Sequence, residues 1–271
     1  MDRVVWNVHL YFILIGSRIR SQLQYRVSFM SDVAANFVAS LADLAVLLVL
    51  FGHTRILGGW DVGEVAILYG LSATTFALAE LIGGGFDHFA QTIRTGNFDT
   101  LLVRPVGVFL QVLSCEFMLK RLGRMSQGLV VLWVAFRWKQ AVLAPWQWLM
   151  LTGAILCGAL FYISLLLVQA TSCFWAVESL EIFNILTYGG HEMLSYPMDI
   201  YPGWLKRFFV SFLPMAFINY VPAGKVLGKG GLAGALPHWA GWLPPLVGVT
   251  VFMAARAVWE YGVRHYQSTG S

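Results

Sequence analysis

Residues 148–168 form a run of 21 residues without a charged side chain. A helix of about 20 apolar residues is long enough to cross the roughly 30 Å hydrocarbon core of a bilayer. The rest of the chain follows the same trend, since 58% of its residues are hydrophobic and 12% are charged, whereas soluble domains carry about 25% charged residues. Too few charges remain to cover a water-facing surface. The sequence therefore predicts an all-α integral membrane protein.

Apolar segments of similar length recur along the chain. We predict six transmembrane helices, at about residues 31–52, 62–86, 112–136, 146–170, 174–195 and 241–262. The glycine triplet at 83–85 is interpreted as a flexible exit from the second of these spans. At the start of the third span, Glu116, Lys120 and Arg124 recur every four residues, which places them on one helical face.

Two apolar segments do not fit a full span. Residues 4–26 carry an apolar stripe with arginines beside it, which predicts an N-terminal interfacial elbow helix; the alternative is a short tilted span. Residues 208–221 are apolar but too short to cross, and Pro214 interrupts them. A re-entrant helical hairpin at about 202–223, before the last span, accounts for this pattern.

The loops on the two sides of the predicted spans differ in their content of Lys and Arg. With the N-terminus inside, eleven of the 18 basic residues fall on the cytoplasmic side and seven on the outer side. We therefore predict a multi-pass protein of the plasma membrane, the bacterial inner membrane, with cytoplasmic N- and C-termini. The net charge of +4 is explained by these loops, so membrane lipids are expected partners and nucleic acid is not.

The sequence contains neither a phosphate-binding loop nor a zinc-protease motif. Residues 224–230 read GKVLGKG, without the earlier glycine and the following hydroxyl residue that a phosphate-binding loop requires. His191-Glu192 lacks the second histidine of a zinc-protease motif, and the three cysteines have no metal-ligand spacing. We predict no catalytic residues, no metal site and no cofactor in this chain.

Carboxylates within the predicted spans are the remaining candidates for chemistry. An ionised carboxylate in lipid is costly, so such residues face protein or a water-filled path. They are interpreted either as the lining of a path for a polar or cationic substrate or for protons, or as contacts between helices. The candidate path residues are Asn36, Ser40, Asp43, Glu80, Glu178 and Glu181.

Two stretches resemble a known family. Residues 95–105, TGNFDTLLVRP, are similar to the Gly-x-apolar-Asp-x-x-Leu-x-Arg-Pro segment of a branch of ABC-2 type transporter permeases. YP at 196–197, IYP at 200–202 and LPMAFINYVPA at 213–223 resemble the second signature of that branch. The order of elbow helix, six spans and hairpin also agrees over almost the whole chain.

The resemblance implies a permease subunit of an ATP-driven exporter of a small or amphiphilic substrate, such as a drug-like compound, a lipid or a glycoconjugate. ATP and Mg would be bound by a soluble ABC ATPase partner, present in two copies, and a second permease chain, identical or related, would complete the path. A cytoplasmic coupling helix at about 93–105 would dock on the ATPase, with Phe98 and Leu102 as its apolar anchor. Its residues are Arg94, Gly96, Phe98, Asp99, Leu102, Arg104 and Pro105.

The resemblance also implies that the hairpin is part of an exit gate at the outer leaflet. The gate residues are Tyr201, Pro202, Pro214, Phe217, Asn219, Tyr220 and Pro222. Two alternatives from other classes remain. One is an ion- or proton-coupled secondary transporter that uses Asp43 and Glu80, and the other is a membrane-embedded transferase or protease.

Overall fold

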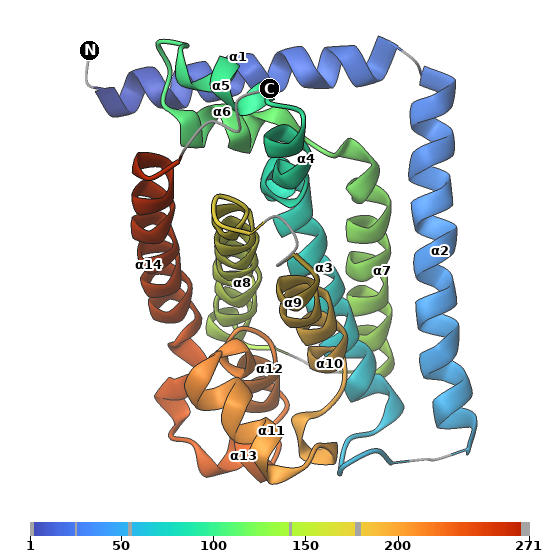
Figure 1. The fold of residues 1–271 in the computed structure, drawn as a ribbon. Helices are drawn as coiled ribbons and strands as arrows, with labels where there is room; N and C mark the ends of the chain where they lie inside the picture. The colour runs from blue at the N-terminus through green and yellow to red at the C-terminus, as the bar shows by residue number, and fades with distance from the viewer. Residues whose placement is uncertain (1–2, 25, 54–55, 141–142, 177–179, 267–271) are drawn as a thin grey trace.

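The computed structural model describes residues 3–24, 26–53, 56–140, 143–176 and 180–266. These residues form helices and the turns between them, so the prediction of an all-α protein is confirmed for the described part of the chain. Figure 1 shows long helices that run alongside one another and one N-terminal helix that lies across their end. The long helices are α2 (Arg26–His53), α3 (Val62–Asp87), α7 (Leu122–Trp138), α8 (Pro145–Ser172) and α14 (Pro244–Arg264).

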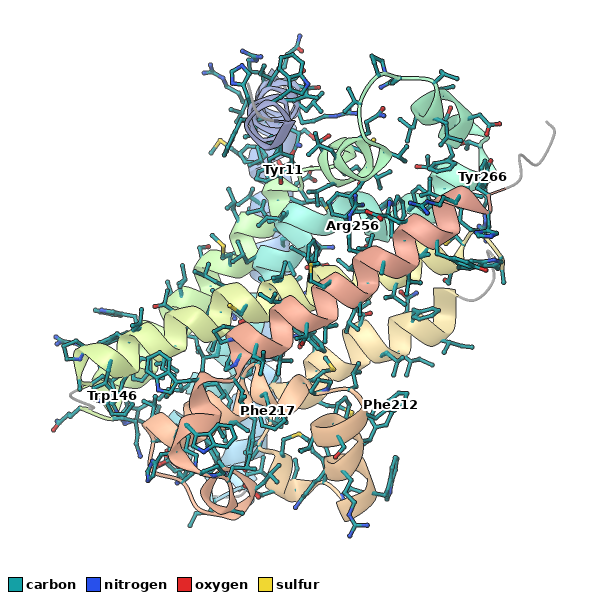
Figure 2. All side chains as sticks on the ribbon, turned by 90° about the vertical axis from the view of Figure 1, so that its left-hand side faces the viewer. Tyr11, Trp146, Phe212, Phe217, Arg256 and Tyr266 are labelled. Carbon is teal, nitrogen blue, oxygen red and sulfur yellow. The ribbon has the colours of Figure 1, made fainter. Side chains whose placement is uncertain are left out.

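The short elements gather at the two ends of this bundle. At the end that α1 crosses, here called the α1 end, lie α1 (Arg3–Gln24), α4 (Phe89–Arg94), α5 (Asn97–Leu102), α6 (Val108–Cys115) and η1 (Leu119–Arg121) (Figure 1). At the opposite end, here called the hairpin end, lie η4 (Met198–Ile200), α11 (Gly203–Arg207), η5 (Phe208–Phe212), η6 (Met215–Phe217), α12 (Tyr220–Val226), α13 (Gly231–Ala235) and η7 (His238–Trp242). Figure 2 shows Tyr11 and Tyr266 at the α1 end, and Trp146, Phe212 and Phe217 at the hairpin end.

Three helical stretches within the described residues are long and apolar enough to cross a membrane. They are Val62–Arg94, Pro145–Ser172 and Pro244–Arg264. A fourth span results if Gly203–Phe212 and Met215–Val226, which meet at 81°, are counted together as a broken span; the same bend is also what a re-entrant loop requires. The total of six spans and the membrane position of α1 therefore stay predictions.

Glycines set how closely the central helix α3 approaches its neighbours. A Cβ added to Gly70 would lie 3.0 Å from the carbonyl oxygen of Gly128 in α7, so the two backbones are in contact where they cross. Small residues at helix crossings are typical of membrane bundles. The prediction of a flexible exit at 83–85 is wrong, because these glycines lie inside α3. A Cβ on Gly85 would overlap the carbonyl oxygen of Val112 in α6.

The predicted third span is not one helix. It is broken after α6, where Glu116 is extended with φ −133° and ψ 108°, and helical structure resumes only at η1. The break is stabilised by Gln22 of α1, whose amide nitrogen donates to the Phe117 carbonyl oxygen at 2.6 Å and whose amide oxygen accepts from the Leu119 N–H at 3.3 Å. The prediction that Glu116, Lys120 and Arg124 share one helical face is therefore wrong, because Glu116 lies in the break.

The predicted fifth span also differs from the observed structure. Helix α8 continues to Ser172 and is followed by a turn, so residues 173–175 do not begin a new span. The next described helices are α9 (Leu180–Asn184), a π-helical turn η3 (Ile185–Gly189) and α10 (Gly190–Leu194). Gly190 packs at the hairpin, since a Cβ there would lie 2.9 Å from the Met215 sulfur.

Candidate functional site

The segment between α3 and α6 contains the first signature. Gly96 separates α4 from α5 in a left-handed conformation, with φ 68°, which favours glycine. The ring of Phe98 is fully buried and lies 5.3 Å from Phe89, 5.3 Å from Phe174 and 4.8 Å from Tyr266, measured between ring centroids. Aromatic pairs at these distances and steep angles are stabilising. Phe98 therefore ties the segment to α4, to the end of α8 and to the residues after α14.

The expected exposed pair of Phe98 and Leu102 is not observed, because the two side chains point in different directions. Leu102 is 41% exposed and Val103 is 84% exposed, whereas Phe98 faces inward. Asp99 lies beside Tyr266, and burial together with this carboxylate raises the pKa of Tyr266. The apolar surface offered outward is therefore Leu102 and Val103.

The remaining residues of this segment hold its shape or line its surface. The amide nitrogen of Gln111 donates to the carbonyl oxygens of Leu101, at 2.9 Å, and Val106, at 2.7 Å, and thereby fixes the turn after α5. Three further predicted docking residues have exposed side chains, namely Arg94, Arg104 and Pro105.

The hairpin end contains the second signature, and Asp199 is its centre. The Asp199 carboxylate accepts hydrogen bonds from Trp60 Nε1 at 3.2 Å, from the Tyr220 hydroxyl at 2.5 Å and from the Leu232 N–H at 3.3 Å. These donors come from the turn before α3, from α12 and from α13, so one carboxylate joins three distant segments. Of the predicted gate residues, Tyr220 lies in this network.

The other predicted gate residues occupy different places in the hairpin. The Tyr201 hydroxyl donates to the Met193 carbonyl oxygen at 3.0 Å, and Asn219 accepts from the Thr75 hydroxyl at 3.5 Å. Pro214 marks the break between η5 and η6. Pro222 is buried, Phe217 is half-buried and Pro202 is exposed at the start of α11.

A group of ion pairs lies at the start of α3 at the hairpin end. It is here called the ionic belt and consists of Asp61, Glu64, Lys139 and Lys229. Asp61 and Glu64 form a capping box there. Lys139 lies 2.5 Å from the Asp61 carboxylate and 3.2 Å from that of Glu64, and Lys229 lies 2.5 Å from Glu64. Burial opposes ionisation of Asp61, but the hydrogen bonds from Lys139 and from the Glu64 N–H outweigh it and lower the pKa of the Asp61 carboxyl. The hydrogen bond to Asp61 raises the pKa of Lys139.

The two signatures thus lie at opposite ends of one helical bundle, the first with an exposed rim and the second mostly buried. Residues 37–270 match the family described as "ABC-2 family transporter protein". The chain belongs to the ABC-2 transporter family. Comparison with curated proteins and with solved structures finds no match. Membership of the family, together with the apolar helices, makes this chain a multi-pass membrane permease of the ABC transporter type.

Glu80 of this ABC-2 permease is paired with two arginines. Its carboxylate is 2% exposed and lies 2.8 Å from the Arg121 guanidinium and 3.9 Å from that of Arg124. The Tyr188 hydroxyl lies 2.9 Å from Asp87 and 3.5 Å from Glu80. The arrangement joins α3, η1, α7 and η3, which favours the interpretation of Glu80 as a contact between helices. Residue spacing identified Glu80 but missed Arg121, which follows a helix break that the sequence did not reveal.

The other predicted path residues of the permease are not brought together with Glu80. Asn36 lies on α2, at the edge of the bundle beside α7 (Figure 1), and its amide donates to the Asp32 carbonyl oxygen at 2.9 Å. The side chains of Ser40, Asp43 and Glu181, and the whole of Glu178, lie outside what the structure describes. Their role stays a prediction.

Proposed function

We propose that this ABC-2 permease is the membrane subunit of an exporter in which a separate soluble ATPase binds and hydrolyses ATP with Mg. Segment 93–105 is the docking site for that ATPase, the α1 end faces the cytoplasm, and the hairpin forms part of the exit gate. A second permease chain, identical or related, completes the substrate path. The cargo is a small or amphiphilic compound.

The attachment of Phe98 is the observation that carries this proposal. An exposed strip of Leu102, Val103 and Arg104 is backed by a ring that contacts three separate parts of the chain. A closely packed interior transmits displacement rather than absorbing it. A partner that binds the exposed strip would therefore move α4, α8 and α14 together. A permease that is driven by ATP hydrolysis in another subunit requires such a coupling.

The alternative of proton-coupled transport through Asp43 and Glu80 has less support. A proton carrier needs a carboxylate that can release its cationic partners, whereas Glu80 is held by Arg121 and Arg124 across a helix interface. The ion pairs of Glu80 with Arg121 and Arg124 are expected if Glu80 serves as a contact between helices.

Substitution of Leu102 by Glu tests the docking site. Leu102→Glu places a charge in the centre of the proposed contact, so we expect at least about tenfold less ATPase to co-purify with the permease. Ile200→Glu is the matched control, because Leu102 and Ile200 are both 41% exposed aliphatic side chains and Ile200 lies at the hairpin end. Equal recovery of the ATPase with both variants would overturn the placement of the docking site.

Orientation is tested independently by labelling. Val103→Cys, in a variant that lacks Cys115, Cys157 and Cys173, should react with a membrane-impermeant thiol reagent only after the cells are opened. Trp239→Cys, whose native side chain is 64% exposed at the hairpin end, should react in intact cells. Labelling of position 103 from outside would contradict the proposed topology.

A further inference from the structure

A cavity of about 670 Å³ lies at the α1 end, where α1 and the start of α2 face the broken segment between α6 and η1. Its volume is in the range of cavities that bind small molecules. Its walls are held in place by the hydrogen bond that the Gln22 amide nitrogen donates to the Phe117 carbonyl oxygen and by the one that the Gln22 amide oxygen accepts from the Leu119 N–H. The cavity is therefore a consequence of the helix break.

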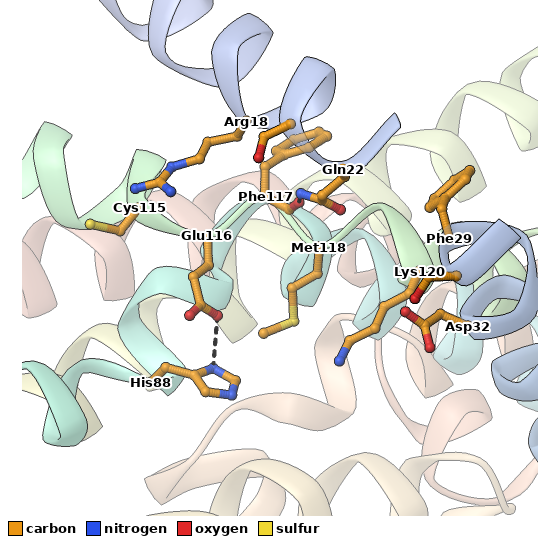
Figure 3. A pocket seen from close by; sticks show the side chains of 12 residues that line it. Arg18, Gln22, Phe29, Asp32, His88, Cys115, Glu116, Phe117, Met118 and Lys120 are labelled. Carbon is orange, nitrogen blue, oxygen red and sulfur yellow. Dashed lines mark hydrogen bonds and ion pairs between the residues drawn. The ribbon is translucent and has the colours of Figure 1, made fainter. Parts of the chain in front are cut away.

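The lining of this cavity is charged but balanced. Figure 3 shows Arg18 and Glu116 toward one side and Lys120 and Asp32 toward the other. Apart from His88, which lies 3.3 Å from the Glu116 carboxylate, the lining thus holds two cations and two carboxylates. A site with this balance matches a ligand that carries both a phosphate and an ammonium group, because each ligand charge then finds an opposite one. An anionic ligand would meet the two carboxylates.

A second, apolar groove of about 430 Å³ continues from the cavity along α2 and α7. Phe29 lines both, and the groove extends along one face of α2 to Phe37. At 1.5 Å per residue the distance from Phe29 to Phe37 is about 12 Å along the helix. Gly123 of α7 lets the two helices touch at the floor of the groove, since a Cβ there would lie 2.6 Å from the Val33 carbonyl oxygen of α2.

From this juxtaposition we infer that the chain holds one ethanolamine phospholipid. The headgroup spans the charged cavity, with its phosphate toward Lys120, on the side of Phe29, and its ammonium toward the Glu116 carboxylate on the opposite side. One acyl chain follows the groove past Phe29 toward Phe37. A primary ammonium donates hydrogen bonds to carboxylates, whereas a trimethylated ammonium cannot, so ethanolamine is favoured over choline. The inference requires the α1 end to lie at a membrane surface but does not depend on the ATPase.

Lipid analysis of the purified protein tests the headgroup site. The wild type, purified in mild detergent from membranes that contain ethanolamine and glycerol phospholipids, should retain about one ethanolamine phospholipid per chain by mass spectrometry. Removing both carboxylates with Asp32→Asn and Glu116→Gln should lower this retention at least about tenfold and favour anionic lipid in its place. Glu260→Gln is the control, since the Glu260 side chain is 51% exposed and that of Glu116 is 47% exposed.

A second pair of variants tests the groove without changing charge. Ala34 lines the groove and Ala35, the next residue on α2, does not. Ala34→Trp should displace the acyl chain and abolish the retained lipid, whereas Ala35→Trp should keep it. The inference is overturned if the wild type retains no more ethanolamine lipid than Ala34→Trp, if anionic lipid is preferred by the wild type, or if the double carboxylate variant retains as much as Glu260→Gln.

Discussion

The two ends of the bundle are held together by different means. At the hairpin end, Asp199 and the ionic belt connect residues that are far apart in the sequence, such as Trp60 with Asp199 and Glu64 with Lys229. At the α1 end, cavities of about 670 and 400 Å³ flank α1. Contacts at this end include the aromatic cluster around Phe98, the amide of Gln22 and the ion pair of Glu80 with Arg121.

The difference indicates where the molecule can deform. Polar networks with several partners per group hold one arrangement, because each broken bond leaves a desolvated group unpaired. Cavities leave room for neighbouring helices to shift. In the proposed exporter, the α1 end would therefore adapt to a partner and to lipid, while the hairpin would move as one body with the start of α3.

The largest expected effect comes from Phe98, the centre of the aromatic cluster at the α1 end. Phe98→Ala leaves a cavity within an aromatic cluster and should lower the free energy of unfolding by about 3–5 kcal/mol. Phe212→Ala is the matched control, because Phe212 is 77% exposed and should change stability by less than about 0.5 kcal/mol. Thermal unfolding in detergent, followed by the fluorescence of the 11 tryptophans, provides the measurement. Equal shifts would mean that this cluster does not anchor the α1 end.

Asp199 should account for the next largest effect. Asp199→Ala leaves the Trp60 and Tyr220 donors without their acceptor, which should cost about 2–4 kcal/mol since a buried unpaired donor costs about 1–3 kcal/mol. Asp199→Asn keeps one acceptor oxygen and should recover about half of the loss. Protease cleavage within residues 199–231 should increase in Asp199→Ala, compared with the wild type and with Asp199→Asn. A hairpin that stays resistant in Asp199→Ala would contradict the view that this carboxylate locks it.

A tight helix crossing at the α1 end should give an intermediate effect. Gly85→Ala would bring a methyl group against the Val112 carbonyl and should cost about 1–3 kcal/mol, because backbone atoms cannot move aside as side chains do. Gly153→Ala is the control, since it lies in α8 with nothing within 4 Å of the added Cβ. It should stabilise the helix by about 0.5–1 kcal/mol. The two melting temperatures should shift in opposite directions.

What the sequence predicted well is what depends on local pattern. Helical content and the start of α3 at 62 follow from apolar runs, and the bend at Pro214 follows from the missing N–H group of proline. The two signature segments are recognised from local motifs, and their roles stay predictions. These features are encoded within short stretches of chain.

What the sequence did not predict depends on contacts between distant residues. The break after Cys115 exists because Gln22, about a hundred positions away, satisfies its backbone groups. The inward direction of Phe98 depends on Phe174 and Tyr266, which no pattern around 93–105 contains. The role of Asp199 was missed for the same reason, because its donors come from three elements. The spacing of Asp61 and Glu64, three residues apart before an apolar run, was the one local signal that could have indicated the capping box.

The smallest effect is the pH dependence of the ionic belt. Because the folded-state pKa of Asp61 lies below 3.8, its pairing stabilises the fold above pH 3.8 and is lost as the pH falls through the folded value. Because the pKa of Lys139 is raised above 10.5, its contribution to the stability of the fold is present below pH 10.5 and is lost as the pH rises through the folded-state pKa. Both groups are partly exposed, so at most about 1 kcal/mol is involved. The melting temperature of the wild type should therefore exceed that of Asp61→Asn by a constant amount between about pH 5 and 9, and the difference should shrink at both extremes. If the difference in melting temperature between the wild type and Asp61→Asn changed between about pH 5 and 9, a group other than Asp61 and Lys139 would be stabilising the hairpin end.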